Sequence, residues 1–101
     1  MVIAVPSRDY GKPRPCLVIQ SDRFRPPSVT IAPITSEMEE IAAIRIPVEP
    51  GPDNGLQVRS LVMCDKIQTI PIGKTGRVVG RLDGETMRLV DSAIGLFLGL
   101  A

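Results

Sequence analysis

The chain has 101 residues, 44% of them hydrophobic, with a formal net charge of +1 at pH 7 and no histidine. This length predicts one small domain over residues 1–101. The near-neutral charge excludes attraction of nucleic acid by general basicity, so any anion site must be local. The missing histidine removes the usual general base and the commonest metal ligand, and no metal or other cofactor is expected.

The first part of the chain predicts short strands separated by polar loops. Residues 2–5 are apolar and predict a strand, and residues 6–15 form a loop rich in proline, glycine and charge. Residues 16–19 are apolar on both faces, which indicates a strand covered on both sides. The strand predicted over residues 29–35 contains Pro33, which requires a sheet edge or a bulge.

The middle of the chain alternates between acidic, apolar and turn-forming segments. Residues 36–40, "SEMEE", are acidic and helix-prone, which predicts one helical turn. Residues 43–48 alternate apolar and polar positions, the pattern of a half-buried strand. Residues 49–55, "EPGPDNG", are typical of a turn, and Asn54-Gly55 can supply a positive-φ hairpin turn.

A further apolar strand is predicted from Ser60 to Cys64 and continues through "DKIQTI". The alternation breaks at Asp65 and Lys66, where a bulge or kink would turn the polar pair outward. The last strand is expected over residues 75–82, with glycines at its bends.

The clearest helix follows this strand. Asp83 is a good N-cap, Glu85 suits the positive end of the helix dipole, and Gly99 can end the helix. Its apolar positions recur at helical spacing, at Met87, Val90, Ile94 and Phe97. Five or six short strands followed by one amphipathic helix predict a small twisted antiparallel sheet or barrel, with the helix over one opening.

The two cysteines and the absence of targeting segments indicate the cellular compartment. Cys16 and Cys64 both lie inside apolar runs, as expected for buried free thiols in a reducing cytoplasm. The chain starts without the pattern of a signal peptide and contains no apolar stretch long enough to span a membrane. A cytoplasmic protein without membrane contact is therefore expected.

Arg14 is held between two prolines immediately before an apolar run. Pro15 disfavours the helical region for Arg14, and Pro13 fixes its own φ, so the cation lies on a stiff, extended backbone. Such a cation loses little entropy when it binds an anion. The alternative is a solvated loop in which the prolines protect a strand edge.

Other polar positions leave two interpretations open. Thr35 ends an apolar strand, where its hydroxyl can donate to a ligand or cap a following helix. Ser60, Lys66 and Gln68 share one side of a strand if the alternation holds, and they face either solvent or a site. Most remaining arginines are expected to be solvated or paired with acids, without an evident grouping: Arg59, Arg77, Arg81 and Arg88.

The loop over residues 21–28 carries a cation–aromatic–cation run, Arg23-Phe24-Arg25. Such a run can bind single-stranded nucleic acid by stacking and charge, although Phe24 can equally fold back onto the core.

These motifs together resemble the MazF/PemK toxins of bacterial toxin–antitoxin systems. The resemblance covers most of the chain and rests on five segments: "GKPRPCLVIQSD", "APIT", "GLQVRSLVMCDKIQTI", "GRL" and the terminal "LGL". It implies a mainly β fold, an SH3-like small β-barrel with a C-terminal α-helix, as in the CcdB/MazF plasmid maintenance toxins. It also implies a homodimeric, metal-independent endoribonuclease that cleaves single-stranded RNA to 2′,3′-cyclic phosphate and 5′-hydroxyl ends.

The resemblance assigns residue roles. Arg14 and Thr35 correspond to the family's catalytic pair, and Lys66 stands where the family usually carries glutamine, which predicts altered RNA contacts. The expected RNA-binding residues are Lys12, Ser60, Asp65, Lys66, Gln68, Arg23, Phe24 and Arg25. An antitoxin protein is expected to cover the same groove, and DNA is expected only indirectly, through an antitoxin.

Two other functions are compatible with the same fold. One is a non-enzymatic, CcdB-like toxin that binds gyrase through its C-terminal helix, and the other is a catalytically silent SH3-like binding module. The first strand lacks the "GD" dipeptide usual in the family, which favours the silent module. Arg14 and Thr35 favour the ribonuclease, because a gyrase binder needs neither.

Overall fold

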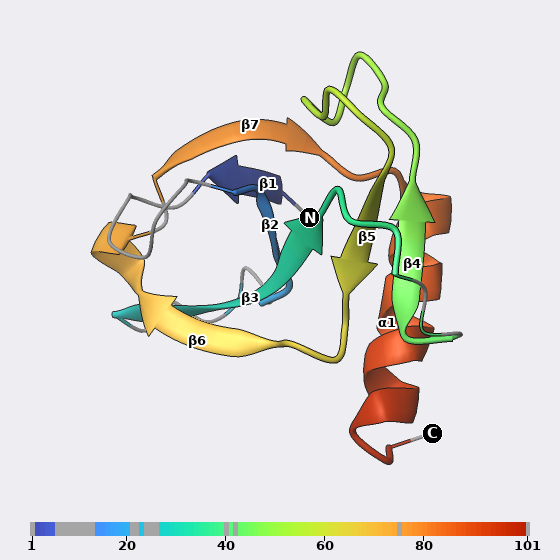
Figure 1. Cartoon of the computed structure of the whole chain (residues 1–101). Helices are drawn as coiled ribbons and strands as arrows, with labels where there is room; N and C mark the ends of the chain where they lie inside the picture. The colour runs from blue at the N-terminus through green and yellow to red at the C-terminus, as the bar shows by residue number, and fades with distance from the viewer. Residues whose placement is uncertain are drawn as a thin grey trace.

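The computed structural model describes residues 2–5, 14–20, 23, 27–39, 41, 43–74 and 76–100. The chain forms a seven-stranded antiparallel sheet followed by one helix (Figure 1). The elements are β1 (Val2–Val5), β2 (Cys16–Val18), β3 (Ser28–Thr35), β4 (Arg45–Val48), β5 (Ser60–Met63), β6 (Gln68–Pro71), a 3₁₀ turn (Ile72–Lys74), β7 (Arg77–Arg81) and α1 (Gly84–Phe97).

The strands follow the order β4-β5-β3-β2-β1-β7, and β6 pairs with β3 outside this path. The prediction of a mainly β fold with a C-terminal helix is confirmed. The sheet curves strongly, as Figure 1 shows for β7, β1, β3 and β6, but it does not close into a complete barrel.

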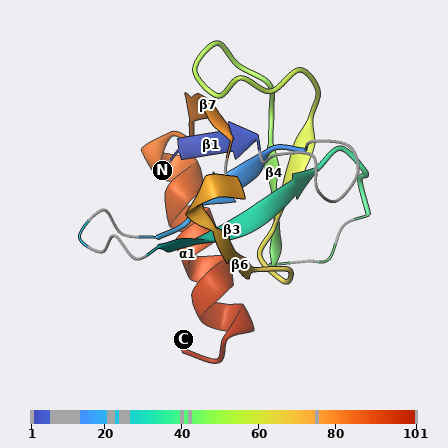
Figure 2. The same cartoon turned by 90° about the vertical axis from the view of Figure 1, so that its left-hand side faces the viewer.

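The eight-residue β3 connects the two halves of the sheet, and Figure 2 shows it crossing the molecule. One edge of β3 pairs with β2, while the other pairs with β6 up to Ile31 and with β5 from Ile34. The Ile34 amide donates toward the β2 side, so the nitrogen of Pro33 faces the gap between β6 and β5. The proline therefore removes no ladder hydrogen bond, which is how β3 accommodates it inside the sheet.

Two predictions about local structure are wrong. The strand expected to continue past Cys64 instead ends at Met63, and a turn closed by the Lys66 amide on the Met63 carbonyl (3.1 Å) separates β5 from β6. The helical turn expected over residues 36–40 is absent from 36–39, because the Glu37 amide donates to the Thr35 hydroxyl (3.1 Å) and bends the chain there.

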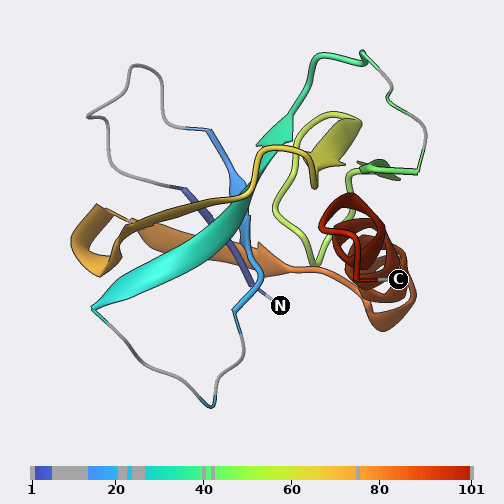
Figure 3. The ribbon, with the colours of Figure 1, turned by 90° about the horizontal axis from the view of Figure 1, so that it is seen from below.

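The helix ends match the prediction, but its position differs from it. Asp83 caps the helix by accepting from the Thr86 amide (2.9 Å), and Gly99 follows it at φ 74°. Instead of covering a barrel opening, α1 lies along β4 at one end of the sheet, as the view along the helix in Figure 3 shows. Met87, Val90 and Ala93 are buried.

The main core lies between the sheet and α1. Phe97 was expected on the buried face of the helix, but it is 46% exposed because the last turn extends beyond β4. The buried members of this core are Ile3, Leu17, Ala32, Ile34, Ile46, Val48, Val62, Cys64, Leu82, Met87, Val90 and Ala93. In the described part of the chain, no helix is both long and apolar enough to cross a membrane.

Candidate active site

Arg14 and Thr35 come from neighbouring backbones. The pairing of β2 with β3 continues beyond β2, because the Ile34 amide donates to the Pro15 carbonyl (3.0 Å). One residue further in this antiparallel register, Arg14 lies opposite Thr35. The two residues that carry the catalytic prediction are therefore adjacent across the sheet, although 21 positions separate them in the sequence.

Arg14 lies at the edge of an open pocket of about 590 Å³. This volume falls in the range of about 300–1,000 Å³ that small-molecule sites occupy, which is large enough for a nucleotide. The pocket is lined by residues of the β2 start, the end of β3, the β4–β5 connection and β7: Arg14, Pro15, Ile34, Ser36, Glu37, Gly55, Leu56, Gln57, Val58, Ser60, Arg77 and Val79.

One wall of the pocket exists because the β4–β5 connection lies directly on β7 (Figure 1). Gly80 faces the Asn54 backbone, and Gly55, at φ 72°, faces the Val79 carbonyl, so closely that neither position has room for a Cβ. The amide that follows Gly80 donates to the Asp53 carbonyl (2.8 Å). The two glycines therefore determine how near this wall lies to the rest of the site.

The Asn54 side chain holds the same connection in shape. Its Oδ1 accepts from the amides of Gly51 (3.1 Å) and Leu56 (3.0 Å), and its Nδ2 donates to the Glu49 carbonyl (2.9 Å). Three hydrogen bonds from one amide side chain restrict the loop conformations. The wall is consequently organised before any ligand binds.

Thr35 and Ser60, at the end of β3 and the start of β5, are the buried polar residues of the described part of the chain. Thr35 is 5% exposed, and its Oγ1 accepts from the Glu37 amide, which leaves the hydroxyl hydrogen available for donation. Its neighbours Ile34 and Ser36 line the pocket, whereas Thr35 is not among the lining residues. Ser60, 4% exposed, lines the pocket and donates to the Val58 carbonyl (2.9 Å).

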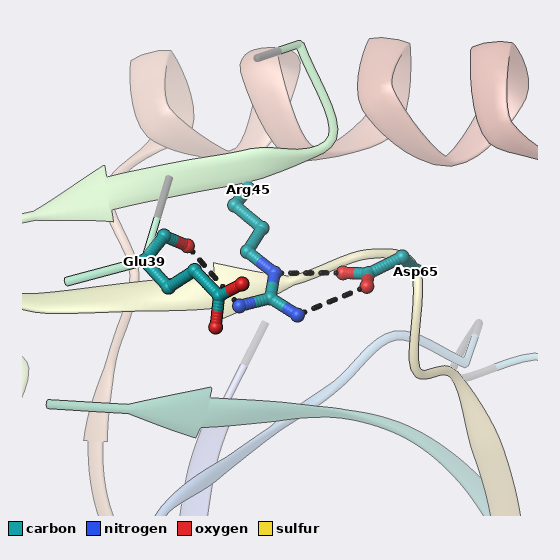
Figure 4. A network of polar contacts seen from close by, with 3 residues as sticks. All are labelled: Glu39, Arg45 and Asp65. Atoms are coloured by element: carbon teal, nitrogen blue, oxygen red, sulfur yellow. Dashed lines mark hydrogen bonds and ion pairs between the residues drawn. The ribbon is translucent and has the colours of Figure 1, made fainter. Parts of the chain in front are cut away.

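Asp65, which was expected to bind RNA, forms an ion pair with Arg45. Its two carboxylate oxygens accept from Nε and Nη2 of Arg45, both at 3.1 Å, and Nη1 donates to the Glu39 carbonyl (Figure 4). The side chains of Arg45 and Asp65 are only 8% and 14% exposed. The hydrogen bonds from Arg45 lower the pKa of Asp65 below its usual value and raise that of Arg45. This ion pair joins β4 to the β5–β6 turn.

Comparison with known proteins identifies the family. Residues 2–98 match the family described as "PemK-like, MazF-like toxin of type II toxin-antitoxin system". The chain belongs to this MazF-like family.

Curated relatives and solved structures agree with this assignment. The chain is 44% identical over 92 residues to the "Probable endoribonuclease MazF" of Mycolicibacterium smegmatis, covering 90% of this chain and 84% of the relative. It is 38% identical over 86 residues to "Endoribonuclease MazF3" of Mycobacterium tuberculosis, covering 83% and 81%. The structure of "Mycobacterium tuberculosis toxin MazF-mt6" superposes with a TM-score of 0.86 at 34% identity, covering 100% of this chain and 99% of that one.

Of the residues predicted for the MazF-like site, Arg14 and Ser60 line one pocket, and Thr35 is buried and is not among the residues that line it. Lys66, Gln68 and Arg23 are exposed and lie outside that lining. Their RNA-binding roles stay predictions, as does that of Asp65. Three further candidates lie outside the described residues: Lys12, Phe24 and Arg25.

The sequence analysis missed three contributors to the pocket. Arg77 was expected to be solvated without a grouping, Glu37 was assigned to a helical turn, and the 55–58 segment was only part of a turn and its flank. No local pattern distinguishes Arg77 from the other arginines. The contact between the β4–β5 connection and β7 has a weak sequence signal, since Asn54-Gly55 and Gly80 are residues that permit close backbone approach.

The cysteines are buried free thiols, as predicted. Burial, with a smaller effect of the neighbouring Asp65 charge, raises the pKa of the Cys64 thiol to about 11. Within the described residues, no three acidic or cysteine side chains gather where they could hold a metal ion.

Proposed function

We propose that this MazF-like chain is an endoribonuclease toxin that cleaves single-stranded RNA, usually mRNA, at specific short sequences and without a metal ion. The observation that carries the proposal is the nucleotide-sized pocket that Arg14 lines together with Ile34 and Ser36 at the end of β3. Membership of the MazF-like family and the names of the two curated relatives support the same activity.

The reaction needs little covalent chemistry from the protein. The attacking 2′-hydroxyl belongs to the substrate, so its proximity to phosphorus is already provided. The 2′-oxygen bonds to phosphorus, the bond from phosphorus to the 5′-oxygen breaks, and the products carry a 2′,3′-cyclic phosphate and a 5′-hydroxyl. The 2′-hydroxyl proton must leave, and the departing 5′-oxygen must gain one.

Arg14 has the main electrostatic role in this proposal. Negative charge develops on the non-bridging phosphate oxygens, and a guanidinium can donate two parallel hydrogen bonds to them. Because Pro15 holds the adjacent backbone in the β2–β3 ladder, Arg14 needs little reorganisation before it binds. The Thr35 hydroxyl hydrogen, at the neighbouring register position, is the second donor to the same phosphate.

Glu37 is our candidate for the proton acceptor. An arginine keeps its proton at neutral pH, and both oxygens of Asp65 accept from Arg45. Glu37 is the acidic residue in the described lining of the pocket, two positions after Thr35. Its carboxylate can accept the 2′-hydroxyl proton directly or through one water molecule.

The proposed partners follow from the family. A type II system pairs a toxin with a protein antitoxin, and we propose that such an antitoxin binds this chain and covers the pocket. We also propose that the protein acts as a homodimer in the cytoplasm, and that DNA is reached only through the antitoxin.

The direct test combines cleavage with end mapping. The purified protein is incubated with a mixed RNA in the presence of EDTA, and the new ends are mapped and chemically assigned. Arg14→Ala should reduce kcat/KM by roughly 10²–10³, the usual effect of removing one donor to a developing oxyanion. Arg88→Ala, an exposed helix residue, removes the same charge away from the pocket and should cleave normally. Failure of the wild-type protein to cut RNA refutes the nuclease.

A further inference from the structure

A second arginine, Arg77, also lines the pocket. It begins β7 and pairs with Val5 of β1. The β1–β2 register, continued by one residue, places Val5 opposite Pro15, so Arg77 and the residue next to Arg14 lie on one row across the sheet. Since one strand separates them, their backbones are about 10 Å apart, twice the interstrand spacing.

The charges around the pocket favour an anionic ligand with more than one charge. Arg14, Arg77 and the acid Glu37 all line the pocket, and neither of these two arginines forms an ion pair with a described residue. By contrast, Arg45 and Arg59 are both paired with carboxylates, Arg45 with Asp65 and Arg59 with Glu49 at 2.6 Å. The pocket lining therefore includes two arginines, on separate segments of the chain, that have no carboxylate partner among the described residues, and arginine suits the recognition of phosphate.

We propose that Arg77 binds the phosphodiester next to the scissile one and thereby positions the RNA on Arg14. The inference rests on the proposed ribonuclease function and adds a second phosphate to its substrate. A single-stranded RNA presents consecutive phosphates along one chain, and two separated guanidiniums match such a ligand better than a lone phosphate. Arg77 is a positioning residue here, because it contacts the substrate away from the bond that breaks.

Binding measurements test Arg77 independently of cleavage. The probe is a short oligonucleotide that contains the mapped cleavage sequence, or a mixed sequence if none is mapped, with 2′-O-methyl groups that prevent reaction. Arg77→Ala should weaken binding on the order of tenfold at low salt, the effect of one charge-assisted contact. The slope of log affinity against log salt should fall by about 0.7, the value for one phosphate on a single strand. Arg81→Ala is the matched control, since Arg81 is exposed on the same strand and lies outside the pocket lining.

A neutral linkage locates the contacted phosphate. A methylphosphonate beside the scissile position should weaken binding to the wild-type protein but not to the Arg77→Ala variant. On cleavable RNA, Arg77→Ala should raise KM with kcat largely retained, whereas Arg14→Ala lowers kcat. The inference is overturned if Arg77→Ala binds with the affinity and salt slope of Arg81→Ala. That result leaves the nuclease intact if the wild-type protein still cleaves, so the two proposals fail separately.

Discussion

Replacing Gly80 by alanine tests whether the β4–β5 connection holds the pocket in its active shape. Gly80 lies inside β7, and the new Cβ would meet only backbone atoms of Asn54, which have no alternative rotamer. It would lie 2.5 Å from the Asn54 carbonyl oxygen and 2.7 Å from its Cα. The connection or the strand must therefore move.

The size of the movement follows from these distances. Ordinary van der Waals contact starts near 3.4 Å, so the Asn54 backbone must retreat by about 1 Å. A displacement of about 1 Å in a positioning element can reduce catalysis about 10²-fold. Overpacking of this kind typically costs about 1–3 kcal/mol of folding free energy, and about 4–8 °C in Tm for each kcal/mol in a domain of this size.

The assay compares kcat/KM for RNA cleavage and the Tm by circular dichroism. We expect Gly80→Ala to remain folded at 20 °C, to melt at a lower temperature and to lose about 10²-fold in kcat/KM. Gly84→Ala is the control, because a Cβ at Gly84 meets nothing within 4 Å and its φ is not positive. This control should keep wild-type activity and the same or a higher Tm.

A Gly80→Ala variant with wild-type Tm and activity would show that the contact between Asn54 and β7 is not close in solution. A Gly80→Ala variant with a lowered Tm and full activity would show that the position of the β4–β5 connection does not affect catalysis.

Three further predictions concern titratable groups. Because Arg45 lowers the folded-state pKa of Asp65, the ion pair stabilises the fold above the ordinary value of 3.8 and this stabilisation is lost as pH falls through the lowered pKa. Asp65→Asn should therefore lower Tm at neutral pH and flatten its decline below about pH 4, and an unchanged acid profile would exclude the pair as a source of stability. Glu37→Gln should reduce kcat by about 10²–10⁴, whereas an unchanged kcat assigns the proton to another acceptor. Cys16 and Cys64 should resist Ellman's reagent at about pH 8 until the protein is denatured, since both are buried and the Cys64 pKa is about 11, and fast labelling of the native protein would contradict this burial.

Elements with strong local signals were predicted well. The helix could be predicted because its two ends are set by local residues. The Asp83 side chain accepts a backbone hydrogen bond at the first turn, and Gly99 adopts the positive φ that ends the helix. The strand predicted over residues 43–48 is β4, Arg45–Val48, in which Ile46 and Val48 are buried while Pro47 is exposed. Its predicted start was wrong, because residues 43–44 form a turn with Ala43 at φ 70°. Asn54-Gly55 was predicted to supply a positive-φ turn, and Gly55 is the one of the two that has a positive φ, 72°.

The misplaced elements depend on distant partners. The apolar pattern from Ser60 onward is the same for a bulged strand and for two strands joined by a turn. The turn coincides with the ion pair of Asp65 to Arg45, which lies 20 positions earlier. Phe97 fits the helical spacing of the buried face, but β4 is too short to cover it. Local patterns report the period of a segment and not the length of the surface against which it packs.

The sequence by itself determined a mainly β chain with a capped helix, buried thiols, and a stiff cation at Arg14, because prolines, caps and periodicity act over a few bonds. It also carried the motifs of the MazF-like family. The tertiary structure alone decided that Arg14 and Arg77 share one pocket, that Glu37 is its acid, and that Asp65 is paired elsewhere. The physical reason is that strand register and the close contact of two glycines bring together residues that are far apart in the sequence, such as Arg14 and Arg77, which are 63 positions apart. No local pattern encodes such distances.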